Sequence, residues 1–337
     1  MTTHNLDNAP TKNIPKSWQY REVSVHAPGL NALADTLIEL AEEGYPIVAG
    51  SADVMYSNNL VKFAERFPDR YIQFGISEQN MVSAAAGLTT TGAMPFVGTF
   101  ASFLALLCCE QIRMDVAYCA RPVRLIGHHS GISMGFYGTS HHATEDLAIM
   151  RSMADLTVIN PADSASLAAA IRASVDHPHP IYFRISRGQE PEVYNADSLD
   201  FQIGKAIEHA QGTDITLIAC GIEVHPTLAA AELLRKEGLS VGVIDMHTIK
   251  PLDKEAILAA ASRCNKIMTI EEHSIIGGLG GAVAEVLADE GLPVKLKRHG
   301  IHDEYVLIGP PSHLYQHYQL DTQGIFEVAT SFLRKNP

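Results

Sequence analysis

Short apolar runs alternate along this chain with longer segments in which apolar residues recur at helical spacing. In the first half, the runs centre on Ile47, Ile72, Phe96, Leu125, Val158 and Tyr182. The segments between them are rich in Ala and Leu, and Leu30 to Glu43 has the periodicity of an amphipathic helix. The apolar runs lack period-two alternation, which is typical of strands buried on both faces of a parallel sheet. The pattern therefore predicts a three-layer α/β domain.

A second alternating series follows a polar stretch. Between Gly188 and Phe201 the sequence turns to Gln, Glu, Pro, Asn and Asp, which is typical of a domain linker. Beyond it we expect strands at 215–219, 241–245 and 266–270 and helices at 226–237, 254–263 and 281–289. The predicted fold is two consecutive three-layer α/β domains with mostly parallel sheets. The predicted bounds are an N-terminal arm at 1–20, a first domain at 21–190, a linker at 191–202 and a second domain at 203–337.

Bulk properties narrow the classes of function. The 337 residues suffice for two domains, each with its own core. The formal net charge of −13 argues against nucleic acid or an anionic membrane as the main partner, because such partners need clustered Lys and Arg. Five cysteines without a C-x-x-C pair suit a reducing compartment. No apolar run has the length of a signal peptide or a membrane span, so we expect a cytoplasmic protein.

The stretch from Phe74 to Leu88 holds the first candidate for chemistry. A short apolar run ends near Phe74, a tight turn at 75–77 follows, and the Ala-rich segment after it is typical of a buried helix. Glu78 is thus expected at a strand-to-helix corner. Ligands of doubly wound α/β sheets bind at the carboxyl ends of strands, so this carboxylate is a candidate site residue. The alternative is that Glu78 only complements the helix dipole.

Later strand ends carry aromatic and imidazole side chains. One apolar run and the turn after it deliver Phe100 and Phe103. The next run and a glycine-rich loop supply four histidines: His128, His129, His141 and His142. A metal site built from these histidines is a less favoured alternative, because metal ligands usually show closer and more regular spacing. We expect His128 and His142 to lie in a solvated loop.

These segments resemble the transketolase family of thiamine diphosphate enzymes. The motifs that carry the resemblance are G-I-S-E-Q-N-M at 75–81, P-F-V-G-T-F-A-S-F at 95–103 and E-Q-I-R at 110–113. Segments 243–253 and 271–281 are similar to the family's C-terminal domain. The resemblance implies a thiamine diphosphate pyrimidine-binding domain followed by a transketolase C-terminal domain.

The resemblance also implies roles for single residues. The acid of the first motif, Glu78, would hydrogen-bond the cofactor's aminopyrimidine ring, on which the two phenylalanines would stack. Imidazoles suit contacts with sugar hydroxyls, and a guanidinium suits a phosphate. Catalytic roles fall on Glu78, His129 and His141; the cofactor would be bound by Glu78, Phe100, Phe103 and Asp53, and the sugar by Ser57, His129, Tyr137, His141 and Arg187.

Two departures from the family bear on the substrate. Transketolases typically carry Asp before Gly in the loop where this chain has Tyr137 and Gly138, so the carboxylate that recognises a sugar hydroxyl is missing. Around Leu30 there is no counterpart of a second phosphate-binding arginine. We therefore expect an unusual or branched ketose donor in place of xylulose 5-phosphate.

A further family motif is missing from this chain. Full-length transketolases hold the diphosphate and Mg²⁺ through Gly-Asp-Gly and a later Asn, whereas this sequence has no Gly-Asp dipeptide. The resemblance therefore implies a separate partner subunit that carries the diphosphate-binding domain and holds Mg²⁺. The active site would lie between the chains of an α2β2 assembly, and no metal ligand is expected in this chain.

The leading function is thus one subunit of a two-chain transketolase. Such an enzyme transfers a two-carbon ketol unit from a ketose (phosphate) donor to an aldose acceptor. One alternative is the β subunit of a 2-oxoacid dehydrogenase, which has the same order of domains. Another is a non-catalytic binding or regulatory subunit. The T-F-A-S-F run at 99–103 and the loop histidines favour the transketolase.

Overall fold

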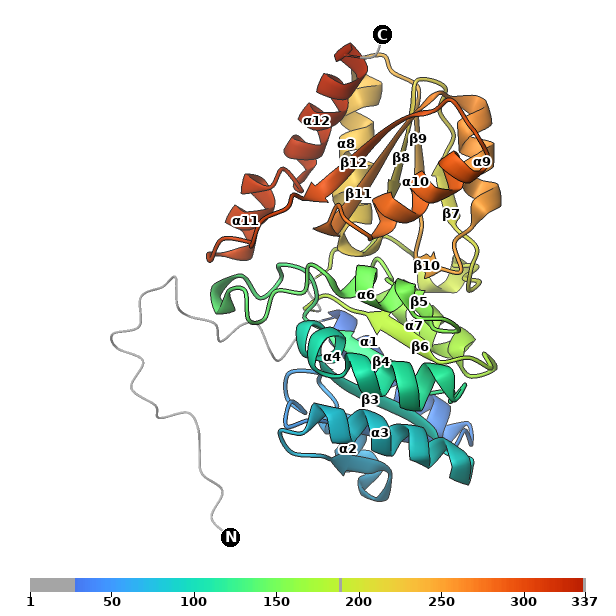
Figure 1. Ribbon diagram of the computed structural model, residues 1–337, viewed down its shortest axis with the longest axis vertical. Coiled ribbons are helices and arrows are strands. Elements are labelled where there is room, and N and C mark those ends of the chain that lie inside the picture. The colour runs from blue at the N-terminus through green and yellow to red at the C-terminus, as the bar shows by residue number, and fades with distance from the viewer. Residues whose placement is uncertain (1–27, 188–189, 336–337) are drawn as a thin grey trace, which may run out of the picture.

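The computed structural model describes residues 28–187 and 190–335 as two α/β units, each built on a mostly parallel sheet (Figure 1). The first unit, blue to green in Figure 1, lies below the second, which runs from yellow to red. The predicted fold class is confirmed. The arm predicted at 1–20 lies outside the described residues.

The first sheet has seven strands in the order β10-β5-β6-β4-β3-β1-β2. All neighbouring pairs are parallel except β10 with β5, which is antiparallel. The six strands expected from the apolar runs are all present. The strands are β1 (Ile47–Ser51), β2 (Tyr71–Gln73), β3 (Met94–Phe100), β4 (Arg124–His128), β5 (Thr157–Ile159), β6 (Ile181–Arg184) and β10 (Thr248–Lys250).

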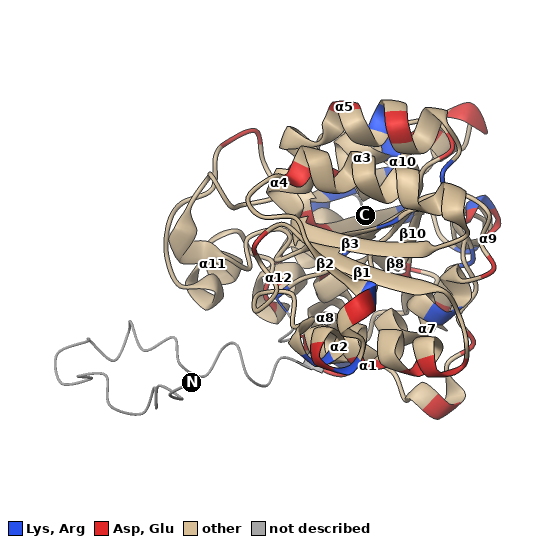
Figure 2. Cartoon of the chain, turned by 90° about the horizontal axis from the view of Figure 1, so that it is seen from below, with Lys and Arg blue, Asp and Glu red and all other residues tan. Residues whose placement is uncertain are grey.

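Helices cover both faces of this sheet, and Figure 2 shows β1 to β3 between the two helical layers. Adjacent strand residues explain the arrangement: Phe96 packs toward α1, α2 and α7, whereas Val97 packs toward α3, α4 and α6. The helices are α1 (Pro28–Glu42), α2 (Val61–Arg66), α3 (Glu78–Leu88), α4 (Ala101–Leu107), α5 (Cys109–Gln111), the π-helix Ile112–Tyr118, α6 (Asp146–Ser152) and α7 (Ser164–Ser174).

The second sheet has five strands in the order β12-β11-β8-β9-β7, with only β7 antiparallel to its neighbour. The strands are β7 (Ile207–Ala210), β8 (Ile215–Ala219), β9 (Val241–Asp245), β11 (Lys266–Ser274) and β12 (Lys295–Ile301). The helices are α8 (Val224–Lys236), α9 (Lys254–Arg263), α10 (Leu279–Asp289), α11 (Pro311–His317) and α12 (Thr322–Lys335). Short 3₁₀ turns lie at 68–70, 89–91, 135–137, 196–198 and 221–223.

The two units are joined by more than a linker. Strand β10 follows β9 of the second unit in sequence but extends the first sheet, where Thr248 pairs with Ile159. One continuous apolar core also runs from α6 of the first unit to α10 of the second and includes Leu147 and Leu279. The periodicity of the sequence did not predict β10. The domain bounds given in the sequence analysis stay a prediction. By sequence β10 falls within the predicted second domain, but in the fold it is part of the first sheet.

The described surface carries charges of both signs. In Figure 2, Lys and Arg are interspersed with Asp and Glu on the helices around the first sheet. All five cysteines have free thiols, as expected for reduced cysteines. Among the described residues, no helix combines the length and the apolar character that a membrane crossing requires.

Candidate active site

The carboxyl edge of the first sheet gathers most of the predicted site. Phe100 at the end of β3 is in register with His128 at the end of β4. Ser51 at the end of β1 is in register with Gln73 at the end of β2. The strands before the phenylalanines and the histidines, β3 and β4, are thus neighbours in the sheet, whereas β2, which precedes Glu78, is separated from β3 by β1.

Glu78 lies at the predicted corner. Strand β2 ends at Gln73, and Glu78 is the first residue of α3, after the cap residue Ser77. Its side chain is half-buried, and no hydrogen bond or ion pair of its carboxyl is found within the described ranges. Burial, followed by the nearby charge of Glu78, raises the pKa of the Cys108 thiol to about 12. Because its carboxyl has no hydrogen-bond or ion-pair partner among the described residues, Glu78 is available to hydrogen-bond a ligand.

Six side chains form what we call the ring cluster: Phe100, Phe103, His128, His129, Tyr137 and His141. Phe100 is its centre, and its ring centroid lies 5.0 Å from that of His128, 5.2 Å from His129, 5.3 Å from His141 and 5.4 Å from Phe103. The ring of Tyr137 lies 4.9 Å from that of His141. The contacts with Phe100 are edge-to-face, the geometry that aromatic rings prefer. Tertiary structure thus brings five of the predicted residues together, namely Phe100, Phe103, His129, Tyr137 and His141.

The histidines of the ring cluster are held neutral. Burial lowers the pKa of His128 to about 3. The pKa of His129 lies well below its usual value, mainly through burial and then through electrostatic interaction with His128 and Arg187. Partial burial also lowers the pKa of His141. Neutral imidazoles can donate at one ring nitrogen and accept at the other, which suits contacts with hydroxyl and carbonyl groups.

The expectation that His128 and His142 are solvated was wrong. His128 is fully buried in strand β4, and its Nδ1 lies 2.8 Å from Nδ1 of His129. His142 is only 4% exposed. His128 follows the buried run 125–127, and His142 directly precedes buried Ala143, so the polar character of these histidines was a poor guide to exposure. Within the described residues, no group of three or more His, Cys, Asp or Glu is arranged to hold a metal ion.

His129 itself has a strained backbone. Its φ of 55° lies in the left-handed region, which costs a residue other than glycine about 1–3 kcal/mol. Hydrogen bonds from its N–H to Ser186 and from Ser130 N–H to Ile185 hold this conformation against the end of β6. A strained residue that the surrounding structure fixes is typical of functional sites.

The remaining predicted residues lie apart from the ring cluster or at its border. Asp53 is exposed after β1, and its N–H donates to Oε1 of Gln73 at 2.7 Å. Ser57 is half-buried in the next turn. Arg187 is close enough for its charge to lower the pKa of His129. In the described part of the chain, no hydrogen bond, ion pair or ring contact joins Asp53, Ser57 or Glu78 to the ring cluster.

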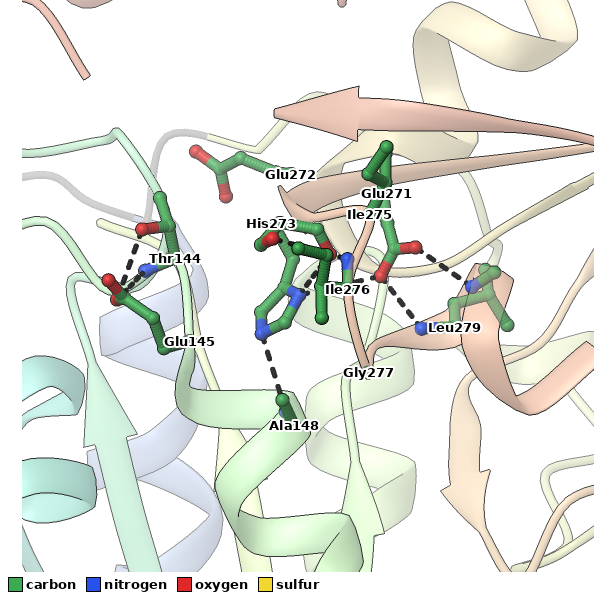
Figure 3. A network of polar contacts seen from close by, with 12 residues as sticks. Thr144, Glu145, Ala148, Glu271, Glu272, His273, Ile275, Ile276, Gly277 and Leu279 are labelled. Atoms are coloured by element: carbon green, nitrogen blue, oxygen red, sulfur yellow. Dashed lines mark hydrogen bonds and ion pairs between the residues drawn. The ribbon is translucent and has the colours of Figure 1, made fainter. Parts of the chain in front are cut away.

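A buried charged network at the junction of the two units was not predicted. Arg184 is 1% exposed; its Nε donates to Asp146 at 2.9 Å, and its guanidinium lies 3.7 Å from Glu272. Burial raises the pKa of Glu272 to about 7, while the charge of Arg184 opposes this shift. Figure 3 shows the neighbouring strand residues Glu271, Glu272 and His273 above α6. An arginine within the apolar run Ile-Tyr-Phe-Arg-Ile was the signal in the sequence.

A cavity of about 420 Å³ also lies at this junction. Thr144 and Glu145 of the first unit line it together with Ser274, His302 and Tyr305 of the second. None of the predicted site residues lines this cavity. The cavity and the ring cluster are therefore separate features of the molecule.

The sequence and the structure both match known families. A family model for the "Transketolase, pyrimidine binding domain" matches residues 29–192, and one for the "Transketolase, C-terminal domain" matches residues 204–325. The chain belongs to the transketolase family. Its members are transferases that depend on thiamine diphosphate, and this chain is a subunit of that type.

Individual transketolase relatives are similar over nearly the whole chain. A subunit of the apulose-4-phosphate transketolase of Phocaeicola vulgatus is 38% identical over 90% of this chain and 97% of its own length. The 6-deoxy-6-sulfo-D-fructose transketolase subunit SqwH of a Clostridium species is 37% identical over 88% of this chain and 91% of its own length. A solved structure, "Split gene transketolase, inactive beta4 tetramer", has a TM-score of 0.83 and 36% identity over 90% of this chain and 97% of its own.

Proposed function

We propose that this chain is one of two different subunits of a transketolase that transfers a ketol unit from a ketose donor with an unusual carbon skeleton or substituent. The supporting observation is the carboxyl edge of the first sheet, which presents both Glu78 and the ring cluster. Two relatives that match nearly end to end are themselves named as subunits.

The residues present suit the pyrimidine end of thiamine diphosphate. Phe100 ends β3, and Glu78 begins α3 after the turn that follows β2; the ends of β3 and β2 themselves are roughly 10 Å apart, because β1 lies between them. Phe100 and Phe103 offer apolar rings, and the Glu78 carboxyl has no hydrogen-bond partner in the described chain. Glu78 would accept or share a proton with the ring, and the phenylalanines would orient it. When bound, the cofactor supplies the carbon nucleophile for the ketose carbonyl.

The sugar would lie over the histidines. His129 and His141 are neutral, so each can donate a hydrogen bond to a carbonyl or hydroxyl oxygen and accept one from a hydroxyl. Arg187, next to His129, would bind a terminal phosphate or another anionic group. Ser57 would assist it, and Asp53 would lie beside the cofactor. These roles follow from the resemblance and from the placement of the side chains at one edge.

The diphosphate and Mg²⁺ are assigned to a partner subunit. This chain lacks the Gly-Asp-Gly motif through which full-length members of the family hold these groups. A second, different subunit would hold them in an α2β2 assembly. If this chain alone retains thiamine diphosphate and Mg²⁺ with micromolar affinity in equilibrium dialysis, the two-subunit site is contradicted.

Tyr137 supports an unusual donor. It occupies the position of the family's aspartate and is 58% exposed beside His141. A ring in place of a carboxylate removes a hydroxyl acceptor and adds an apolar surface. Two relatives are named for unusual substrates, apulose 4-phosphate and 6-deoxy-6-sulfo-D-fructose, and this chain is proposed to take a donor of that kind.

The test is ketol transfer by this chain assembled with its partner, thiamine diphosphate and Mg²⁺. The donors are xylulose 5-phosphate, branched ketose phosphates and 6-deoxy-6-sulfofructose, each with an aldose acceptor. Glu78→Gln should lower the rate by about 100-fold or more, whereas Glu65→Gln, an exposed acid on α2, should not change it. A preference for xylulose 5-phosphate over all other donors would refute the unusual-donor proposal.

Other outcomes identify the alternatives. Decarboxylation of a 2-oxoacid without ketol transfer would indicate the dehydrogenase β subunit. The absence of both reactions, with binding to the partner intact, would indicate a regulatory subunit. Full activity of the Glu78→Gln complex would likewise indicate that this chain has no catalytic role.

A further inference from the structure

The loop at 131–143 carries two residues of the ring cluster, Tyr137 and His141. Its base is closed by a pair of backbone hydrogen bonds: Gly131 N–H donates to Ala143 O at 3.2 Å, and Ala143 N–H donates to Gly131 O at 2.9 Å. Between these points the loop leaves the sheet, and only the 3₁₀ turn at 135–137 is regular. The position of His141 therefore depends on what holds the loop.

The second unit holds the base of this loop. Glu272 Oε1 accepts the N–H of Ile132 at 2.9 Å, and Arg184 Nη2 donates both to Ala143 O and to Glu272 O. Gly131 has a φ of 59°, and a Cβ at this position would lie 2.0 Å from the Glu272 carboxyl. The absence of a side chain at Gly131 lets the carboxylate approach.

The second unit also touches the tip of the loop. Gly309 N–H donates to Gly135 O at 3.2 Å. A Cβ on Gly135 would lie 2.2 Å from the backbone oxygen of Gly309, so the two segments approach as closely as only glycine permits. Next to this contact, Ile308 Cδ1 lies 2.9 Å from the position that a Cβ on Gly138 would occupy.

We propose that the C-terminal unit is a positioning element of the sugar site. Through Glu272 at the base and through 308–309 at the tip, it holds the 131–143 loop so that His141 meets Phe100 and Tyr137 meets His141. The residues that would bind the cofactor, Glu78 and Phe100, lie outside this loop. This inference rests on the proposed function in so far as it names the sugar as the ligand.

Gly135→Ala isolates the tip contact. Gly135 does not have a positive φ, so the substitution adds only the methyl group that would meet Gly309 O. Gly309→Ala is the matched control: its Cβ would meet nothing closer than Leu314 Cδ2 at 3.8 Å, and both of its backbone hydrogen-bonding groups remain. Both variants are measured in the complex with the partner subunit.

In Gly135→Ala, the KM for the ketose donor should rise about tenfold or more, while the affinity for thiamine diphosphate changes little. Amide hydrogen exchange at 135–142 should also accelerate about tenfold, because the loop loses its contact with 309. Gly309→Ala should match the wild type in all of these measurements. A purely structural defect would instead lower cofactor affinity together with the melting temperature.

The outcomes separate this inference from the proposed function. If wild-type complex transfers no ketol unit, the proposed function fails, and hydrogen exchange alone decides whether the loop is held from the C-terminal unit. Unchanged exchange and unchanged KM in Gly135→Ala would overturn the inference even in an active enzyme. If that variant does not fold, Ile308→Ala replaces it, since Ile308 is 69% exposed and its truncation spares the core; the same rise in KM and in exchange is expected.

Discussion

Replacing Arg184 by Met removes the guanidinium at the centre of the buried network that joins the two units. The side chain is 1% exposed. Its guanidinium donates to both oxygens of Asp146 and to the backbone oxygens of Ala143 and Glu272. A methionine of similar length fills much of the space but leaves two buried carboxyl groups without this counter-ion.

The expected loss follows from that burial. Removing one partner of a buried ion pair costs about 3–5 kcal/mol, because the remaining charge is left desolvated. We therefore expect Arg184→Met to lower the free energy of unfolding by about 4 kcal/mol. This is a large part of the roughly 5–15 kcal/mol that stabilises an ordinary protein.

The assay is urea unfolding at neutral pH, followed by circular dichroism. The matched control is Arg172→Met, because Arg172 also pairs with two carboxylates, Glu39 at 2.6 Å and Glu43 at 3.0 Å, but its side chain is 42% exposed. Exposed pairs contribute about 0–1 kcal/mol each, so this control should lose little. If the losses in free energy of unfolding of the two variants differ by less than about 1 kcal/mol, burial does not explain the contribution of Arg184 to stability.

Three further predictions concern other parts of the molecule. Burial raises the pKa of Glu272 to about 7 from its ordinary 4.5, so the stability that the protonated carboxyl contributes is present below pH 4.5 and is lost as the pH rises through 7. In melting experiments, Glu272→Gln should therefore gain stability relative to the wild type as the pH is raised from about 5 to 8. A difference between the two proteins that does not change with pH would contradict this. Phe100→Ala should weaken thiamine diphosphate binding by the complex about two- to tenfold in calorimetric titrations, whereas Phe67→Ala, just after α2, should not. Asp253 accepts the N–H of Ala256 and caps α9, so Asp253→Ala should cost about 1–2 kcal/mol in urea unfolding, with partial rescue by Asn; equal losses for Ala and Asn would refute the capping role.

Several helices and strands were predicted correctly from the apolar periodicity of their own segments. The strands expected at 215–219 and 241–245 and the helix at 254–263 have the bounds that periodicity predicts. The strand expected at 266–270 continues to Ser274, where the last residues are buried by contacts with the first unit. Strands β7, β10 and β12 were not predicted. The first two are short and their pattern is not distinct from that of a loop, and β12 begins with the polar segment Lys-Leu-Lys-Arg-His.

The candidate site was only partly predictable. Motif residues at strand ends pointed to Glu78, Phe100 and His129, because parallel strands place their carboxyl ends at one edge. Which of these residues meet was set by the order β4-β3-β1-β2, in which Phe100 and His128 are neighbours and Glu78 is two strands away. Strand order depends on contacts between residues far apart in the chain, and a periodic pattern carries no information about them.

The apolar periodicity was enough for the two α/β units and for the strand-to-helix corner at Glu78, since burial of one face is a property of each segment. Packing between distant segments decided three other features: the burial of His128, the network around Arg184, and the contacts of the C-terminal unit with the 131–143 loop. From the sequence alone, a histidine or an arginine is expected to be exposed to solvent. Whether it is buried depends on whether the folded neighbours supply its hydrogen bonds and counter-charges, and those neighbours lie tens of residues away.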